Sequence, residues 1–347
     1  MSANVVGIDI GTAAVRAAEV SDAGRSNPML VRYHEVALPD GAVSRGEVLE
    51  PNTVAAAIKQ LWSAGGFKSK NVVLGMGNHR VVARDLSVPK MPMKRIREML
   101  PFQVQDLISV PVVDALLDFY PISESEGENG PQINGLLVAA IKESVLGNVK
   151  AVELAGLTPV EVDLIPFALS RSISRGARTD DAVVQIDVGA GTTTVVITYA
   201  GVPQFVRLIP TGGDDLTQAL MLRLAITAEQ AELLKRSVGL GPAAPGDEAA
   251  VAVVREVTTE LINSLRNTVN YFVNTRKSVA VSRIVLTGGG SRLAGFAEAL
   301  TEVTRLPVVA PDPSLSIGLG RGVDAEALKQ TQGTYLVALG LALGSKA

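Results

Sequence analysis

Apolar residues along this chain occur both in short strand-like runs and in longer stretches with helical spacing. Strands are predicted at Val5–Ile10, Val15–Val20 and Leu30–Ala37, where β-branched residues gather in short runs. A helix is predicted at Thr53–Ala64, which ends at the pair Gly65-Gly66. The resulting order of three strands and a helix predicts the start of a mixed α/β domain.

The pattern changes between about Asn71 and Leu157, which we interpret as a compact inserted subdomain. Strands are predicted at Val72–Gly75, Val81–Val88, Asp118–Ile122 and Gly135–Ile141, a polar loop at Ser123–Asn134, and helices at Met93–Ser109 and Glu143–Leu154. We expect Pro101 to kink or split the first of these helices, because proline removes a backbone donor and clashes with the preceding turn.

The rest of the chain alternates strands and helices again. Strands are predicted at Val160–Asp163 and Arg283–Leu286, and a hairpin is predicted at Ala182–Tyr199, followed by a further strand that ends at Ile209. Helices are predicted to begin at or near Pro166, Asp214, Ala228, Asp247, Leu293 and Thr334. A loop rich in Pro and Gly is predicted from Pro311 to Gly322. This half therefore also predicts an α/β domain.

Composition excludes several classes of protein. The chain has 347 residues, enough for two or more domains, and 35 acidic residues against 32 basic ones give no basic excess for nucleic acid. It has no cysteine, so disulfides, thiol catalysis and zinc–thiolate sites are excluded. The apolar run Tyr335–Leu343 is about half of the ~20 residues that cross a membrane. With no basic and apolar leader at the start, we expect a soluble protein.

Two segments repeat one motif in the two halves of the chain. Gly7–Arg16 and Gln185–Thr194 each place an aspartate at the end of an apolar strand, before a turn of Gly, Ala and Thr. Such turns present backbone N–H groups that suit phosphate, and a nearby carboxylate can hold Mg²⁺ through water. We expect Asp9 and Asp187 to be the metal ligands. The expected phosphate-binding residues are Gly11, Thr12, Ala13, Ala14, Arg16, Gly189, Gly191, Thr192 and Thr193.

For one such motif alone, an ordinary Asp-Gly turn that closes a hairpin is an equal alternative. A third glycine-rich turn, Thr287–Ser291, follows a further predicted strand. Two copies of the motif together with this turn favour a nucleotide clamp, and the repetition indicates an internal duplication of one half-domain.

The order of these motifs resembles the superfamily of actin, heat-shock chaperones and sugar kinases. Within it the chain is most similar to the PilM family of type IV pilus assembly. The closer similarity lies in Leu86–Pro92, Ile209–Thr217, Glu232–Arg236 and Arg283–Phe296. The resemblance implies an α/β, actin-like (ribonuclease H-like) ATPase fold of two duplicated lobes with an inserted α+β subdomain in the first lobe.

The resemblance also implies domain boundaries. The first-lobe core is expected at 1–68, 158–181 and 331–347, and the inserted subdomain at 69–157. The second-lobe core is expected at 182–213 and 280–330, and a helical subdomain at 214–279. ATP and Mg²⁺ are the implied cofactors, held between the lobes.

Further site residues follow from the resemblance. The helix that carries Glu232, Lys235 and Arg236 is expected to contact ribose and adenine, whereas a solvated charged face is the alternative without the family. The remaining expected cofactor contacts are Gly212, Gly213 and Asp214 at a helix N-terminus, and Gly288, Gly289, Gly290, Ser291 and Arg292 beneath the adenine.

Hydrolysis is expected to be slow or absent. Hydrolytic relatives carry an acid immediately before the proline that opens the helix between the lobes, but here Ile165 precedes Pro166. Asp163, the one catalytic candidate, lies two residues earlier on a predicted strand, roughly 7 Å from that position. This is too far for the same hydrogen bond to water.

The resemblance implies an adapter as the first hypothesis for function. The partner is the N-terminal cytoplasmic peptide of a PilN-like inner-membrane protein, which keeps the chain in the cytoplasm at the inner face of the membrane. The peptide is expected between the first-lobe core and the inserted subdomain, around Val81–Val88 and Phe102–Ile108. Self-association is left open.

Two alternatives belong to other classes. A small-molecule kinase of the superfamily needs a proton-accepting acid in the cleft, for which the sequence offers no convincing candidate. A filament-forming cytoskeletal ATPase like FtsA normally ends in an amphipathic membrane helix, and this sequence stops three residues after Gly344. We therefore expect an adapter instead of a kinase or a filament-forming ATPase.

Overall fold

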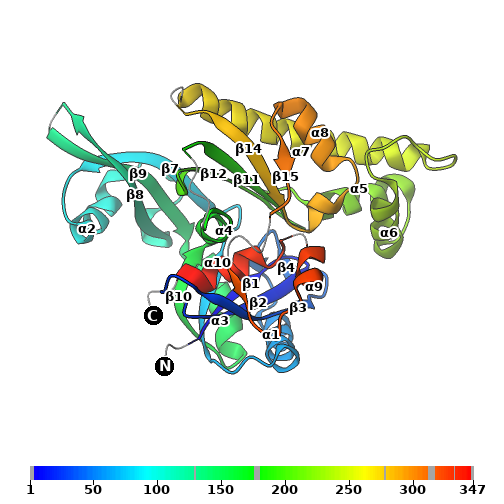
Figure 1. Ribbon diagram of the computed structural model, residues 1–347, viewed down its shortest axis with the longest axis horizontal. Coiled ribbons are helices and arrows are strands. Elements are labelled where there is room, and N and C mark those ends of the chain that lie inside the picture. The colour runs from blue at the N-terminus through cyan, green and yellow to red at the C-terminus, as the bar shows by residue number, and fades with distance from the viewer. Residues whose placement is uncertain are drawn as a thin grey trace.

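The computed structural model describes residues 4–128, 130–175, 180–276, 279–311, 317–331 and 333–344. Two lobes, each built on a twisted sheet, lie one above the other in Figure 1. A strand-rich projection with α2 extends to one side and the helices α5 and α6 to the other.

The first lobe is built on a six-stranded sheet in the order β10-β6-β1-β2-β3-β16. Its strands are β1 (Val5–Ile10), β2 (Ala14–Ser21), β3 (Met29–Ala37), β6 (Asn71–Met76), β10 (Thr158–Leu164) and β16 (Gly318–Leu319). β1, β2 and β3 form an antiparallel meander, and β6 and β10 continue the sheet in parallel with β1. The helix α1 (Pro51–Gly65) packs on it and ends at Gly66, whose φ of +68° suits glycine.

The second lobe repeats this topology. Its sheet has the order β13-β12-β11-β14-β15, with an antiparallel meander followed by two parallel strands. The strands are β11 (Ala182–Val188), β12 (Thr193–Tyr199), β13 (Val202–Ile209), β14 (Val281–Thr287) and β15 (Val308–Val309). The internal duplication inferred from the two motifs is therefore present in the strand order.

Two helices pack where the lobes meet, α4 (Ile165–Ser174) and α10 (Leu336–Gly344) (Figure 1). Glycines allow their close approach: a Cβ at Gly340 would lie 1.8 Å from the Ala168 carbonyl oxygen, and one at Gly7 would lie 2.2 Å from the Ala338 carbonyl oxygen. The apolar sequence of α10 thus serves burial on several sides, against both α4 and β1.

The projection consists of the sheet β7-β9-β8 and the helix α2. Its elements are β7 (Val81–Pro89), α2 (Met93–Gln103), the 3₁₀ helix η1 (Val112–Asp114), β8 (Ala115–Gly127) and β9 (Gly130–Ile141). We call these residues, 81–141, the inserted subdomain. β6 lies in the first-lobe sheet, and α3 (Lys142–Leu154) packs on α1. The expected wider bounds of the insertion, 69–157, stay a prediction.

The polar loop predicted at Ser123–Asn134 is wrong. Residues 123–127 and 130–134 extend β8 and β9 into a long hairpin, in which Gly127 pairs with Gly130. The polar side chains pair across the strands, since Asn134 accepts a hydrogen bond from Ser87 at 2.7 Å and donates one to Ser125 at 2.9 Å. Helix α2 is also shorter than predicted and ends at Gln103, two residues after Pro101, as the helix-breaking effect of proline favours.

Several shorter elements complete the fold. The helices α5 (Gly213–Leu224), α6 (Ala228–Val238) and α7 (Glu248–Thr275) share a core that includes Leu216, Leu220, Ala231 and Val254, and we call them the helical subdomain. The 3₁₀ helix η2 (Gly289–Arg292) and α8 (Phe296–Thr304) follow β14. The hairpin β4 (Val43–Ser44) and β5 (Glu47–Val48) and the helix α9 (Ala325–Gln330) were not predicted.

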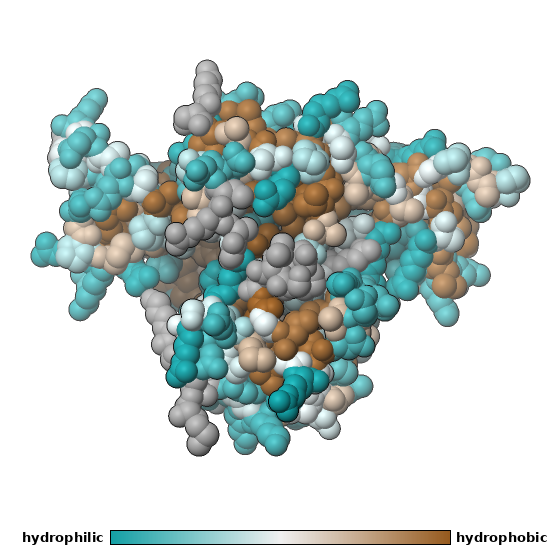
Figure 2. Space-filling view, in the orientation of Figure 1, coloured by the Kyte–Doolittle hydropathy of each residue, from teal (hydrophilic) through white to brown (hydrophobic). Residues whose placement is uncertain are grey.

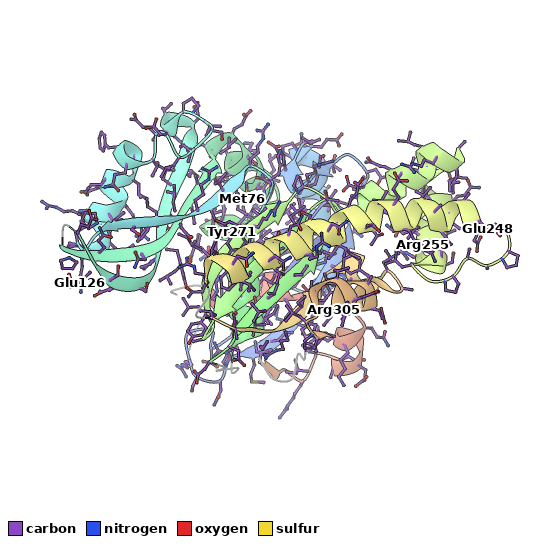
Figure 3. The ribbon with its side chains drawn as sticks, turned by 90° about the horizontal axis from the view of Figure 1, so that it is seen from above. Met76, Glu126, Glu248, Arg255, Tyr271 and Arg305 are labelled. Atoms are coloured by element: carbon purple, nitrogen blue, oxygen red, sulfur yellow. The ribbon has the colours of Figure 1, made fainter. Side chains whose placement is uncertain are left out.

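One apolar cluster joins the inserted subdomain to both lobes. It combines Val138 of β9 and Met76 of β6 with Phe167 of α4 and with Val196 and Val206 of the second-lobe sheet. Figure 3 shows Met76 where the strands of the inserted subdomain approach the other sheets, and shows α7 running from Glu248 at one end of the molecule to Tyr271 beside this junction.

Arg276, which follows α7, forms an ion pair of 3.2 Å with Asp85 of β7 at the same junction. The inserted subdomain is therefore tied to the second lobe by charge as well as by its apolar contacts.

Within the described residues, no helix is long and apolar enough to cross a membrane. On the face shown in Figure 2, hydrophobic residues reach the surface as separate patches among hydrophilic ones.

Candidate functional site

The two repeated motifs form equivalent hairpin turns. Gly11 donates its backbone N–H to the Ala14 carbonyl oxygen at 3.0 Å, and Gly189 donates to the Thr192 carbonyl oxygen at 2.9 Å. Asp9 and Asp187 occupy the same place in each hairpin, one residue before the strand ends at the loop. The predicted pair of Asp-Gly hairpins is thus confirmed as local structure.

The two turns meet across the gap between the lobes. A Cβ at Gly191 would lie 2.6 Å from the Thr12 hydroxyl oxygen and 3.1 Å from the Arg45 Cα, so this position accepts only glycine without a shift of its neighbours. The expected phosphate-binding segments of the two halves therefore lie side by side.

Two carboxylates lie at these turns, those of Asp9, which is buried, and Asp187, which is half-buried. Burial is the main reason that the pKa of Asp9 is raised from its ordinary value of 3.8 to about 6, and the negative charge of Asp187 adds to the rise. Burial also raises the pKa of Asp187, against a hydrogen bond of 2.7 Å from the Thr287 hydroxyl. Arg16 offsets part of the charge, with its Nη1 3.6 Å from Asp9 and its Nε 3.0 Å from Glu35.

This acidic pair fits a hydrated cation. Two carboxylates with water and phosphate oxygens are what Mg²⁺ commonly accepts. In the described parts of the chain, no group of three or more His, Asp or Glu forms a denser metal site. An incoming divalent ion would stabilise both ionised acids, which the protein by itself holds at a cost.

The backbone N–H groups at the start of α5 have partners within the protein. The N–H groups of Gly213 and Asp214 donate to the carbonyl oxygens of Gly189 and Ala190 at 3.0 and 2.8 Å. The N–H of Gly212 donates to the Asp215 carboxylate at 2.8 Å. These donors have acceptors within the protein, so the three residues support the second turn, and their contact with a nucleotide stays a prediction. Burial raises the pKa of Asp214.

The charged residues of α6 are linked into one network at this helix start. Lys235 donates to the Gly213 carbonyl oxygen at 3.2 Å and to the Thr217 hydroxyl at 2.8 Å, and pairs with Glu232 at 2.5 Å. Glu232 also pairs with Arg236 at 3.0 Å. The prediction that these residues share one face of the helix is confirmed. Their exposure differs, since the Lys235 side chain is 16% exposed, whereas that of Arg236 is 73% exposed and lies at the surface.

The glycine-rich turn after β14 packs directly on the end of β11. Gly288 has a φ of +90°, and a Cβ there would lie 2.4 Å from the Val188 carbonyl oxygen. A Cβ at Gly290 would lie 2.5 Å from the Val188 side chain, whereas Gly289 faces open space. The Ser291 hydroxyl donates to the Gly288 carbonyl oxygen at 2.7 Å. The turn therefore lies beside Asp187, within the same site.

Arg292, expected beneath the adenine, donates instead to the carbonyl oxygens of Gln330 and Thr331 at 3.2 and 3.1 Å. In this arrangement its guanidinium holds α9 against the glycine-rich turn.

Asp163 is engaged elsewhere in the fold. Its carboxylate pairs with Arg171 and accepts the backbone N–H of Leu164 at 2.7 Å. Arg171 in turn donates to the Gly340 carbonyl oxygen at 3.0 Å, so Asp163 helps to fasten α4 to α10. The position before Pro166 is filled by Ile165, which packs so closely on Gly77 that a Cβ there would lie 2.7 Å from the Ile165 Cβ.

Sequence reasoning missed Arg45. Arg45 and Gly46 form the two-residue turn between β4 and β5, with φ values of +49° and +78°. From there the Arg45 guanidinium donates to the Pro210 carbonyl oxygen at 2.5 Å and pairs with Asp215 at 3.2 Å. The Arg-Gly dipeptide signals a tight turn, but no sequence pattern indicates a partner so far along the chain.

With this geometry in view, we compared the chain with known proteins. The family model described as "Type IV pilus assembly protein PilM" matches residues 7–346. Among solved structures, the PilM-PilN type IV pilus biogenesis complex is 29% identical with a TM-score of 0.86, over 99% of this chain and 98% of that one.

More distant structures share the fold. The ethanolamine utilization protein EutJ from Carboxydothermus hydrogenoformans is 16% identical over 99% of this chain and 91% of its own, with a TM-score of 0.57. MreB 5 of Spiroplasma citri, solved with bound AMPPNP, is 12% identical over 100% and 97%, with a TM-score of 0.53. The expected actin-like fold is confirmed.

Cell division protein FtsA is similar at lower identity. The protein from Bacillus subtilis is 23% identical over 245 residues, which is 64% of this chain and 54% of that protein. The one from Pseudomonas aeruginosa is 24% identical over 347 residues, 88% of this chain and 82% of that protein.

Proposed function

The chain belongs to the PilM family of type IV pilus assembly proteins, and we propose that it is an ATP-binding adapter that receives the N-terminal tail of a PilN-like membrane protein. Membership supports a role in pilus assembly and a PilN-like partner, since the similar solved structure is a PilM-PilN complex. The tail would keep the chain at the cytoplasmic face of the membrane.

One observation carries the nucleotide proposal: two equivalent acid-bearing turns meet where the lobes meet, so closely that a Cβ at Gly191 would lie 2.6 Å from the Thr12 hydroxyl oxygen. Backbone N–H groups of both turns would hold the phosphates, and Asp9 and Asp187 would hold Mg²⁺ through water. The Glu232–Lys235 face of α6 and the Gly288–Gly290 turn would flank the nucleoside, as the resemblance to the family implies.

Slow or absent hydrolysis belongs to the same proposal. Ile165 offers no proton acceptor where hydrolytic relatives carry an acid, and the Asp163 carboxylate is taken up by Arg171. The site therefore favours retention of the bound nucleotide over its turnover.

Calorimetric titration with MgATP tests binding. Gly191→Val is the sharpest variant, because its side chain would fill the space beside Thr12 where the two turns meet. We expect it to lower the affinity for MgATP at least tenfold. Gly241→Val, at a glycine with open space around it, is the matched control. Equal affinities of the two variants would contradict the proposed phosphate site.

Phosphate release under single-turnover conditions tests the chemistry. We expect release over minutes or longer in the wild type. Fast turnover that is abolished by Asp163→Ala would contradict the retention proposal.

The tail is proposed to bind at a groove on the first lobe. A groove of about 320 Å³ runs between α3 and β10, lined by Val149, Leu157, Pro159, Val160 and Val162 among others. β10 is the outermost strand of its sheet, and no strand of the described chain pairs with its outer edge. Val160 and Val162 are 56% and 40% exposed.

An extended peptide suits this groove. The free edge of β10 offers main-chain hydrogen bonds to an added strand, and the valines offer apolar contacts. Glu153 also lines the groove, so a tail that carries basic side chains is favoured. Val81–Val88 and Phe102–Ile108, the contact regions expected from the resemblance, stay a prediction: Val81 and Val88 are 5% and 2% exposed and belong to the core, whereas Phe102 is 80% exposed.

Fluorescence polarisation with a labelled tail peptide tests this site. Val162→Asp is expected to weaken binding at least tenfold, because it places a charge among the apolar contacts. Val309→Asp is a matched control: Val309 is also 40% exposed and also lies on the last strand of a sheet, but in the second lobe. Equal binding by both variants would exclude the groove.

A further inference from the structure

Arg45 connects the two lobes at the turns of the candidate site. Its backbone belongs to the β4–β5 hairpin of the first lobe, and its Cα lies 3.1 Å from the place of a Gly191 Cβ. Three turns thus converge: one around Thr12, one around Gly191 and one at Arg45. The side chain of Arg45 then continues onto the second lobe.

The second-lobe partners of Arg45 lie on both sides of Gly212. Its Nη1 donates to the Pro210 carbonyl oxygen at 2.5 Å, and its Nη2 lies 3.2 Å from the Asp215 carboxylate. Asp215 in turn accepts the N–H of Gly212, next to the residues that support the second turn. One guanidinium therefore links the first lobe to the segment that positions the phosphate-binding turn.

The backbone of Arg45 lies in the left-handed region. Its φ of +49° is left-handed, which costs a non-glycine residue about 1 kcal/mol. Glycine would adopt this conformation without that cost. The side chain of Arg45 makes the contacts between the lobes, because its guanidinium reaches two acceptors at once.

We propose that Arg45 is a positioning residue that latches the lobes together over the phosphate site and so sets how long a nucleoside triphosphate stays bound. The proposal rests on the proposed nucleotide binding. Release of a ligand held between both turns requires the lobes to part, and parting breaks both contacts of Arg45. The latch acts on the lobes and therefore slows the release of ADP as well as ATP.

The matched control is Arg80, which pairs with Glu47 on the same hairpin at 3.3 Å. Its side chain is 39% exposed, close to the 45% of Arg45, but its partner is in the first lobe. Arg80→Ala therefore removes a comparable ion pair from the hairpin without breaking a contact between the lobes.

The first measurement is the release of mant-ATP and mant-ADP with Mg²⁺, chased with excess ATP in a stopped-flow instrument. Since partly exposed pairs contribute modestly, Arg45→Ala is expected to release both nucleotides about three- to tenfold faster than the wild type. Arg45→Lys is expected to lie between, because it keeps the charge but loses the fork. Arg80→Ala is expected to release at the wild-type rate.

The second measurement needs no nucleotide. The chain has no cysteine, so spin labels can be placed at Lys59→Cys on α1 and Glu229→Cys on α6, both exposed. Pulsed electron spin resonance should show a longer or broader distance in Arg45→Ala than in Arg80→Ala.

The inference is overturned if Arg45→Ala and Arg80→Ala give the same distances, or if they release nucleotide at the same rate. A wild-type chain that binds no mant-nucleotide would overturn the proposed function instead, while the spin-label distances would still test the latch.

Discussion

Replacement of Asp9 by asparagine should stabilise the nucleotide-free protein. Asp9 is only 7% exposed, and its pKa is raised from 3.8 to about 6, with burial as the largest cause. The shift is about 2 pKa units, and at about 1.36 kcal/mol per unit the folded protein loses about 3 kcal/mol by keeping this group ionised. This cost already includes the attraction of Arg16.

The sign fixes the pH window. An acid with a raised pKa in the folded state favours folding while it is protonated, and this contribution is lost as the pH rises from 3.8 through about 6. Asparagine has no such loss. Asp9→Asn should therefore exceed the wild type in stability at pH 8, by up to about 3 kcal/mol, and the difference should vanish near pH 4.

Thermal melting between pH 4 and pH 8, with EDTA to remove divalent ions, measures this difference. A rise of a few degrees is expected at pH 8 for a chain of this size. Asp106→Asn, at an exposed acid, is the control and should change little. If Asp9→Asn melts below the wild type at pH 8 in EDTA, the buried carboxylate stabilises the empty protein and the reasoning is refuted.

The remaining predictions concern binding, packing and the link between helices. MgATP affinity should fall as the pH drops below about 6, because Asp9 takes up a proton; calorimetry at pH 5 and pH 8 checks this, and equal affinities would contradict it. Gly340→Ala should destabilise the chain by at least about 2 kcal/mol, since its Cβ would meet the Ala168 carbonyl oxygen at 1.8 Å. Gly322→Ala, with open space around the glycine, should not, and equal melting curves would exclude the packing argument. Arg171→Ala should lower the melting temperature, because it leaves Asp163 partly buried without its cation; Arg25→Ala, in an exposed pair with Asp22, serves as the control.

The sequence predicted the hairpins well because two local signals agree there. Alternating apolar residues and a glycine turn mark Asp9 and Asp187 in the same way, and the structure repeats the same hydrogen bond in each turn. The inner part of the hairpin β8–β9 was predicted as a strand pair, but its outer part was missed because it is polar. Ser125 and Asn134 form a hydrogen bond across the strands there, which no alternation of hydrophobicity reports.

The sequence pattern did not predict contacts between distant parts of the chain. The N–H groups at the start of α5 looked free for phosphate, but their acceptors, the carbonyl oxygens of Gly189 and Ala190, belong to another element. Arg45 gave no signal for the same reason, since Pro210 and Asp215 become its neighbours only after both lobes have formed.

The apolar cluster around Met76 has a thermodynamic consequence. It joins residues of the inserted subdomain to both sheets, with Val196 and Val206 on one side and Phe167 on the other. A close-packed core has few alternative arrangements, so a change in the angle between the lobes must displace it. α3 contributes Val145 to the same cluster and Val149 to the tail groove. By linkage, any factor by which ATP changes the affinity for the tail must equal the factor by which the tail changes the affinity for ATP.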